Sequence, residues 1–334
     1  MRMGSSALLL VKWLGVLLSI SFTCSNAFLP PNVYHVGGRG GRSALLCTSD
    51  FGSIPVKEGT VQVTRILEGT ESLFDLSYKL VRPMSLSSRK AAPIIALHGG
   101  PSVPSNYLYP LATCVPYRSI LFHDMLGCGA SDQPTDLDAY SIEQAVDDLE
   151  AMLKKLSIRR FHLYGQSFGG IVAFEYLKRC AERGKIDGGD EGCLSLILSS
   201  TPTNVVQVEG EAESLIGQLS SPEVFRETHQ CRTPEIPKPL SDAYAAAGTV
   251  WRGTAVIKDY VAQAPVKEAA VMPSTMVMRG EHDFVTEICC KDWKEVLNSR
   301  SVRNRVLEGC SHHGLLENEA MYGEIVDSFF LEYD

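Results

Sequence analysis

The feature that most limits the fold is an alternation of short apolar runs with helix-like stretches from about residue 60 onward. Two of the runs are continuously apolar, as buried central strands are, at 93–98 and 119–124. Further strand-like runs follow at 161–165, 193–200, 274–280 and 303–309. Helical periodicity separates and follows them at 141–156, 168–183 and 319–333. Strands separated by helices predict an α/β fold, with a mostly parallel central sheet covered by helices on both faces.

Local patterns predict the first strands and one helix start. Residues 61–67 and 73–81 have the two-residue period of a half-exposed hairpin that precedes the parallel strands. The helix at 141–156 begins with Ser141 as a candidate N-cap, and Gln144 three residues later completes a predicted capping box.

One long segment departs from the alternation. Between Thr201 and Met272 the sequence becomes proline-rich and only partly helical, so it cannot be a tight connection between strands. We therefore expect a core formed by residues 50–201 and 271–334. Residues 202–270 are predicted to be inserted as a helical cap over the sheet edge, where ligand pockets form in such folds.

Charge and cysteine content exclude several classes of function. The formal charge is −8 and no basic stripe occurs, so we expect no nucleic-acid partner. The cysteines beyond residue 50 form no Cys-x-x-Cys, and the histidines do not pair at metal-ligand spacings. We expect these cysteines to be small buried apolar residues. We predict no metal, no cofactor, and a small-molecule or short-peptide substrate; the oligomeric state stays open.

The N-terminus differs in charge from the rest of the chain. Residues 1–49 contain four basic residues and no acid, which is typical of a processed leader. The apolar stretch that follows Arg2 and the small residues Ser25 and Ala27 predict a signal peptide over 1–27. The alternative is a single N-terminal membrane anchor.

Residues 28–49 resemble the second half of the bipartite leaders of algae with secondary plastids, in which a phenylalanine follows the signal cleavage point. Phe28 occupies that place here. The resemblance implies entry to the secretory pathway and then a plastid, with no stable membrane association after the leader is removed. Plain secretion, with 28–49 as a mobile tail, is the alternative.

A serine lies at a predicted bend between a strand and a helix, in Gly165-Gln166-Ser167-Phe168-Gly169. This sequence fits G-x-S-x-G, in which the serine occupies a strained turn and its hydroxyl is exposed. Bulky residues next to that turn would clash with the adjoining strand and helix, and glycine avoids this. Ser167 is therefore the candidate nucleophile.

A serine hydroxyl needs a base, and the base needs an acid that orients it. In folds with this elbow the chain order is serine, acid, histidine. Asp283 follows a late predicted strand and is the candidate acid, with Glu281 as the competing residue. His312 and its neighbour His313 follow the last strand. We favour His312 as the base and keep His313 as the alternative.

The oxyanion that forms in acyl transfer needs two aimed N–H groups. One is predicted from Phe168, directly after the nucleophile. The other is predicted from Gly100 in the loop "HGGP", which comprises His98, Gly99, Gly100 and Pro101. Glycine lets the backbone approach a substrate carbonyl, and proline stiffens the turn. His98 is interpreted as a residue that braces this loop.

Five motifs occur in order between about residues 93 and 317: "HGGP", "HDMLGCGASDQP" at 123–134, "GQSFGG", "GEHD" and "GCSH". Together they resemble the proline iminopeptidases and their near relatives among the α/β-hydrolases. The resemblance implies the α/β-hydrolase fold. It also implies metal-free release of an N-terminal proline, or hydrolysis of a related amide or ester, through an acyl-enzyme. By position it carries Ser167, Asp283, His312 and the loop around Gly100 into their roles.

This chain departs from the family pattern in two places. Ser102 stands where the family usually has glycine after "HGGP", so it crowds the oxyanion loop or adds a hydroxyl to the pocket. The predicted cap is short, and an aminopeptidase must pair its substrate's ammonium with carboxylates. Glu213 and Glu227 are the candidates for that pairing. The other cap acids we considered are Glu209, Glu211 and Glu223.

Two other functions stay open. The same residues would serve a carboxylesterase, a lactonase or a carbon–carbon-bond hydrolase, and an apolar pocket without a buried carboxylate would favour an ester. A binding protein built on a hydrolase fold, without catalysis, is the alternative from another class.

Overall fold

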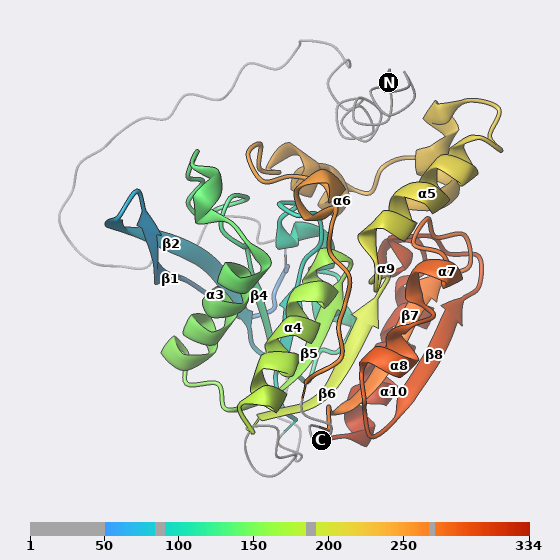
Figure 1. Cartoon of the computed structure of the whole chain (residues 1–334). Coiled ribbons are helices and arrows are strands. Elements are labelled where there is room, and N and C mark those ends of the chain that lie inside the picture. The colour runs from blue at the N-terminus through green and yellow to red at the C-terminus, as the bar shows by residue number, and fades with distance from the viewer. Residues whose placement is uncertain (1–50, 84–90, 185–191, 267–270) are drawn as a thin grey trace, which may run out of the picture. The chain divides into compact units, whose positions relative to one another are not determined.

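The computed structural model describes residues 51–83, 91–184, 192–266 and 271–334 (Figure 1). The predicted signal peptide and transit-like leader lie outside the described residues, and they stay predictions together with the plastid location. The chain divides into two units, and the second, Ile54–Asp334, holds all the elements discussed below.

The second unit is built on one eight-stranded sheet with the order β1-β2-β4-β3-β5-β6-β7-β8. β1 and β2 form the predicted antiparallel hairpin, β2 is antiparallel to β4, and every later pairing is parallel. The mostly parallel sheet is thereby confirmed. Its strands are β1 (Val56–Leu67), β2 (Thr70–Val81), β3 (Ile94–Leu97), β4 (Ile120–His123), β5 (Arg160–Gln166), β6 (Gly192–Ser199), β7 (Ser274–Gly280) and β8 (Val302–Leu307).

Helices connect these strands and follow the last one (Figure 1). The α-helices are α2 (Leu111–Cys114), α3 (Ile142–Lys155), α4 (Phe168–Glu182), α5 (Val205–Ile216), α6 (Lys238–Ala245), α7 (Glu287–Cys290), α8 (Trp293–Val296), α9 (Gly314–Glu317) and α10 (Glu319–Glu332). Short 3-10 or π turns occur at η2 (Ser105–Leu108), η3 (Leu137–Ala139), η4 (Pro222–Val224), η5 (Arg226–Gln230) and η6 (Thr254–Ile257).

The burial of the strands explains why their apolar sequence patterns predict them correctly. Every residue of β3 and β4 is buried, as their continuous apolar sequence requires. Ser141 caps α3 by accepting a hydrogen bond from the Gln144 N–H at 3.1 Å. The Gln144 amide, however, donates to the Asp138 carbonyl at 3.1 Å instead of returning to Ser141. The predicted capping box is therefore only half formed, because the preceding η3 turn offers an acceptor.

Side chains of β5 show that helices cover both faces of the sheet. The ring of Phe161 lies 6.3 Å from Tyr176 of α4, and the ring of His162 lies 4.7 Å from Phe330 of α10. Successive side chains of a strand point to opposite faces. Helices α4 and α10 therefore pack on opposite sides of β5, as the sequence predicts.

The strand order places the functional loops. The chain leaves β3 to form β4 on one side and then crosses to form β5 on the other side of β3. Ligands of open α/β sheets bind outside the carboxyl ends of the strands where the order reverses. The segment between β6 and β7, with α5 and α6, lies beyond these strand ends (Figure 1). Its treatment as a separate cap, 202–270, stays a prediction.

Most of the described cysteines lie in the interior. Six of the eight described cysteines are buried, and all eight are free thiols. The predicted role of small apolar residues is confirmed for these six. Among the residues outside the grey trace of Figure 1, no helix has the length and apolar character that crossing a membrane requires.

Buried histidines predict that acid destabilises the fold. Burial lowers the pKa of His123 to about 4, and burial also lowers the pKa values of His98, His162 and His313. Below pH 6.5 the unfolded chain then binds more protons than the folded chain, so stability falls as the pH falls from about 6.5 toward 4. His123 alone accounts for a loss of about 2 kcal/mol between pH 7 and pH 5.

Urea unfolding at pH 7 and pH 5 measures this loss directly. We expect a lower free energy of unfolding at pH 5, and a smaller difference between the two pH values in His123→Gln, because that variant lacks the titrating ring. Equal free energies of unfolding of the unmodified chain at the two pH values would contradict the prediction.

Candidate active site

The backbone at Ser167 has the geometry of a strained turn. Its φ is 54° and its ψ is −120°, a region that residues other than glycine rarely adopt, and it joins the end of β5 to the first turn of α4. A Cβ at Gly165 would lie 2.4 Å from the Cα of Gly170, and one at Gly169 would lie 2.2 Å from the Leu97 carbonyl oxygen. Both predicted elbow glycines are thus required by close backbone approaches.

His312 is paired with Asp283 at the carboxyl edge of the sheet. The His312 Nδ1 lies 2.8 Å from the Asp283 Oδ1, and both side chains are buried. The same oxygen accepts the Val285 N–H at 2.8 Å, which fixes the carboxylate. The Phe284 ring covers the imidazole at 4.2 Å. A carboxylate only accepts, so Nδ1 carries the proton and Nε2 of the neutral ring is an acceptor.

The two competing residues lie elsewhere. His313 turns away from Asp283: its Nε2 is 3.5 Å from the Tyr244 hydroxyl, and its ring meets Tyr107 edge-on. Burial and the neighbouring His312 lower its pKa well below the usual value. Glu281 is half exposed and accepts the Gly309 N–H at 2.9 Å. Of these candidate acids and bases, the structure pairs only Asp283 with His312.

The predicted oxyanion loop, 98–101, follows β3 and adopts a conformation that requires glycine. Gly100 has a φ of 125°, and a Cβ there would lie 2.5 Å from the Ser102 nitrogen. The bond from Gly100 to Pro101 is cis. Phe168 begins α4, and the first N–H groups of a helix have no partner within the helix. The Phe168 N–H is therefore suited to bind an anion.

His98 braces this loop from beneath. It is fully buried, its Nδ1 lies 3.0 Å from the Gly99 carbonyl, and its Nε2 accepts the Met125 N–H at 2.9 Å. A carbonyl only accepts, so Nδ1 donates and the ring is neutral. Burial lowers the pKa of His98, in agreement with this assignment. The sequence interpretation of His98 as a bracing residue agrees with these contacts.

Sequence reasoning missed a relay that connects three loops. The Tyr107 hydroxyl accepts the Gly99 N–H at 2.6 Å and donates to the Gln166 Oε1 at 2.7 Å. The Gln166 Nε2 then donates to the His312 carbonyl at 3.3 Å. The oxyanion loop, the elbow and the histidine loop are thus joined through two side chains. The position of Gln166 next to Ser167 in the motif could have indicated its importance. No sequence signal singles out Tyr107.

The motif at 123–134 supports the same loops. The buried Asp124 accepts three hydrogen bonds, from the N–H and the hydroxyl of Ser105 and from the Ala130 N–H. A Cβ at Gly129 would lie 2.2 Å from the Asp124 Oδ2. Asp124 therefore holds Ser105, in the segment after the predicted oxyanion loop, against the turn at 127–131.

Ser102, the departure from the family pattern, links the oxyanion loop to the predicted cap. Its hydroxyl donates to the Trp251 carbonyl at 2.5 Å, and its carbonyl accepts the Gly248 N–H at 2.9 Å. The Trp251 ring meets the Phe168 ring edge-on at 5.2 Å. The Ser102 hydroxyl is thus committed to a backbone contact and is not a pocket group.

The two predicted amine-binding carboxylates do not lie at a buried site. Glu213 is exposed on α5. Glu227 is exposed and pairs with Arg226 at 3.4 Å. Glu223 is also exposed. These three acids are therefore interpreted as charges on a solvated surface, because their side chains are exposed to solvent.

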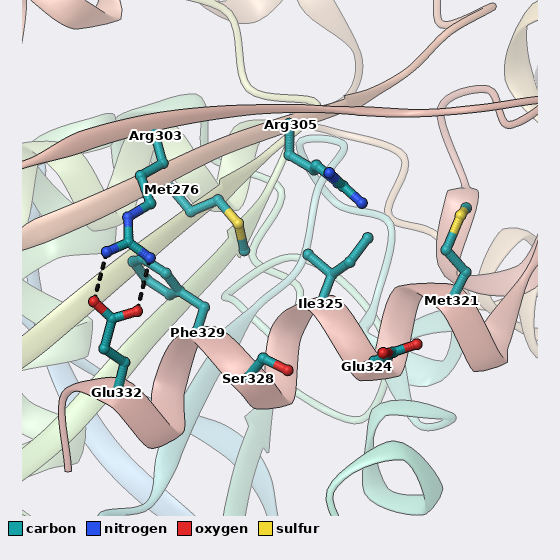
Figure 2. A pocket seen from close by; sticks show the side chains of 9 residues that line it. All are labelled: Met276, Arg303, Arg305, Met321, Glu324, Ile325, Ser328, Phe329 and Glu332. Carbon is teal, nitrogen blue, oxygen red and sulfur yellow. Dashed lines mark hydrogen bonds and ion pairs between the residues drawn. The ribbon is translucent and has the colours of Figure 1, made fainter.

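A groove elsewhere on the sheet is not part of this site. It lies between β8 and α10, has a volume of about 300 Å³, and contains the bidentate pair of Arg303 and Glu332 over Met276 and Phe329 (Figure 2). No predicted site residue lines it. Among the described residues, no cluster of three or more histidine, cysteine or acidic side chains is suited to hold a metal ion.

Comparisons with known proteins agree with the predicted fold. A family model described as the alpha/beta hydrolase fold matches residues 92–221. A proline iminopeptidase of Saccharolobus solfataricus is 28% identical over 299 residues, which cover 78% of this chain and 91% of that protein. A proline iminopeptidase of Lactobacillus helveticus is 26% identical over 297 residues, which cover 78% of this chain and 96% of that protein.

Two solved structures show the same fold. Proline iminopeptidase from Mycobacterium smegmatis superposes with a TM-score of 0.68 and 21% identity, over 83% of this chain and 98% of that chain. An esterase from Exiguobacterium antarcticum superposes with a TM-score of 0.56 and 19% identity, over 77% of this chain and 96% of that chain. The predicted α/β-hydrolase fold is confirmed. This chain is a hydrolase of the α/β-hydrolase fold, and its sequence is similar to those of the proline iminopeptidases.

Proposed function

We propose that this chain is a serine hydrolase that cleaves an amide or ester through an acyl-enzyme on Ser167. The observation that carries the proposal is the buried hydrogen bond of 2.8 Å between His312 and Asp283. This pair lies at the sheet edge where the strained turn holds Ser167. A histidine oriented by a carboxylate, together with a serine on such a turn, is the arrangement that activates a hydroxyl.

The protonation pattern determines the chemical roles. Asp283 accepts a hydrogen bond from the Nδ1–H of His312, so Nε2 takes the proton of Ser167 as the hydroxyl oxygen bonds to the substrate carbonyl carbon. Asp283 stabilises the imidazolium that forms. His312 then passes the proton to the leaving group, whose bond to the carbonyl carbon breaks. Water releases the acyl group by the same steps, with His312 again as the base.

Backbone N–H groups stabilise the negative charge that develops on the carbonyl oxygen. Phe168 offers its N–H at the N-terminus of α4, where the helix dipole favours an anion. Gly100 offers the second N–H from the loop that His98 and Tyr107 hold in place. Loss of one such donor in a related arrangement lowers kcat by about 10²- to 10³-fold.

The first candidate activity is release of N-terminal proline from short peptides. The similarity to proline iminopeptidases over 78% of the chain supports it. The second candidate is hydrolysis of an ester, lactone or carbon–carbon bond. The exposed positions of Glu213 and Glu227 favour this second candidate, because an ammonium ion needs a carboxylate partner when it is desolvated.

A panel of substrates tests the proposal and separates the two activities. Prolyl-β-naphthylamide, other aminoacyl-naphthylamides and p-nitrophenyl esters are given to the unmodified chain, to Ser167→Ala and to Ser328→Ala. Ser328 is exposed on α10 and serves as the matched control. We expect turnover by the unmodified chain and the control, and loss of about 10⁴-fold or more in Ser167→Ala. Equal activity of all three proteins would contradict the proposal.

A further inference from the structure

The backbone at Arg252 is held beside the candidate active site by contacts of the preceding residue, Trp251. The Trp251 carbonyl accepts the hydroxyl of Ser102 in the oxyanion loop at 2.5 Å. The Trp251 ring packs edge-on against Phe168, the residue after Ser167, and stacks on Tyr140 at 5.8 Å. The backbone that carries Arg252 is thus fixed against both predicted oxyanion elements.

The Arg252 side chain has no partner within the described part of the chain. Its Nε is buried and makes no hydrogen bond, and no ion pair involves its guanidinium. Burial also lowers the pKa of this guanidinium. Buried polar groups are almost always paired, and an arginine carries five N–H donors. The Arg252 side chain is half-buried, and its Nε–H is the buried donor that has no partner among the described residues.

The neighbouring groups are neutral. Burial raises the pKa of Tyr244, so its phenol stays protonated although Arg226 and Arg252 both act to lower that pKa. The Tyr244 hydroxyl accepts the Gln230 amide at 2.9 Å and lies 3.5 Å from the Nε2 of His313. Burial and its neighbouring histidine keep His313 neutral as well. The groups between Arg252 and the histidine loop therefore supply no negative charge.

Two acids of this segment have partners other than Arg252. Glu209 accepts the Thr254 hydroxyl at 3.3 Å, and Glu211 accepts the Thr286 hydroxyl at 2.8 Å. None of the acids in the described part of the predicted cap forms an ion pair with Arg252. The site thus presents a cation without a counter-charge, which is the reverse of the sequence expectation of carboxylates for an ammonium ion.

We propose that Arg252 binds a carboxylate of the substrate, so that the hydrolase acts on amides or esters that carry a free carboxylate. This inference rests on the proposed function and specifies its substrate class. A guanidinium binds a carboxylate through two parallel hydrogen bonds, and such charge-assisted pairs are strong where water is partly excluded. A short peptide with a free C-terminus and the half-ester of a dicarboxylic acid both meet this requirement.

Two matched pairs of compounds test the inference. The peptide pair is prolylglycine and prolylglycinamide, in which the carboxylate lies on the leaving side. The ester pair is the mono-p-nitrophenyl ester of adipic acid and the same ester of adipic acid monoamide, in which it lies on the acyl side. Each carboxamide nearly matches its carboxylate in shape and differs in charge. We expect the unmodified chain to prefer the acid in at least one pair, by about tenfold or more in kcat/KM and mainly through KM.

Variants attribute that preference to one residue. In Arg252→Gln the ratio of kcat/KM for the acid to kcat/KM for the amide should fall to about one. Arg252→Lys should keep part of the preference for the acid, because the positive charge remains. Arg300→Gln removes the same charge from an exposed position and should leave the ratio unchanged. The same pairs are also compared as competitors of fluorophosphonate labelling, which reports binding without turnover.

The failures can be told apart. An unmodified chain that fluorophosphonate labels at Ser167, but that binds and hydrolyses acid and amide equally in both pairs, overturns the inference and leaves the proposed function standing. Retention of the preference in Arg252→Gln overturns it too. Absence of both labelling and hydrolysis contradicts the proposed function and this inference together.

Discussion

His312→Gln lowers kcat by at least about 10⁴-fold, on whichever ester or amide the unmodified chain hydrolyses. The variant loses the only base that is paired with Asp283, at 2.8 Å, and leaves the Ser167 hydroxyl without a proton acceptor. Steady-state kinetics, with the protein concentration measured by ultraviolet absorbance, checks this value. The far-ultraviolet circular dichroism should be unchanged, because the histidine lies on a loop and not in the sheet.

His313→Gln is the matched control for this prediction. His313 adjoins His312, is buried to the same extent, and has no contact with Asp283. We expect its kcat to stay within about tenfold of that of the unmodified chain. A larger loss in His313→Gln than in His312→Gln would show that the structure pairs the wrong histidine with the acid.

Gly169→Ala destabilises the fold by about 3 kcal/mol or more. The added Cβ would lie 2.2 Å from the Leu97 carbonyl oxygen and 2.6 Å from the His98 carbonyl oxygen. Both are backbone atoms that β3 and its following loop hold in place, so neither can move aside without disturbing the sheet or the oxyanion loop. Urea denaturation followed by tryptophan fluorescence measures the loss.

Gly210→Ala provides the contrast for that measurement. Gly210 lies inside α5, and a Cβ there meets nothing within 4 Å. Alanine favours a helix interior over glycine, so we expect unchanged stability or a gain of up to about 1 kcal/mol. Equal stabilities of the Gly169 and Gly210 variants would mean that α4 does not approach β3 as closely as described.

Much of the fold could be predicted because its signals are local. The run 274–280 was predicted as a strand and is β7, Ser274–Gly280, since the apolar residues Met276, Val277 and Met278 at its centre are buried in the parallel sheet. The β1–β2 hairpin could be predicted because only one of its faces is covered, which gives its sequence a two-residue period. The hydrogen bond from Gln144 to the Asp138 carbonyl could not be predicted, because it depends on how the η3 turn meets α3.

The candidate site was predictable in part for the same reason. Ser167, Asp283 and His312 each follow a strand of a parallel sheet, so the topology places all three at the same edge of the sheet. Tyr107 and Arg252 have no motif, and their importance comes from contacts between segments far apart in the chain. The roles of Glu213 and Glu227 rested on composition alone, which does not say which way a helix face points.

The pairing of Arg252 with a substrate carboxylate would also explain the position of Ser102. A glycine there would remove the hydroxyl that holds the Trp251 carbonyl, and the backbone of the arginine would lose that anchor. The departure from the family pattern and the unpaired cation are thus joined by one hydrogen bond. The oxyanion loop and the predicted cap are coupled through it.

A serine hydrolase with the proposed nucleophile forms a covalent bond between Ser167 and an electrophile. The most direct measurement is intact mass spectrometry after treatment with a neutral fluorophosphonate, followed by peptide mapping. We expect a single adduct on Ser167 that forms at least about 100-fold more slowly in His312→Gln. An unmodified mass, or an adduct on another residue while Ser167 stays free, would contradict it.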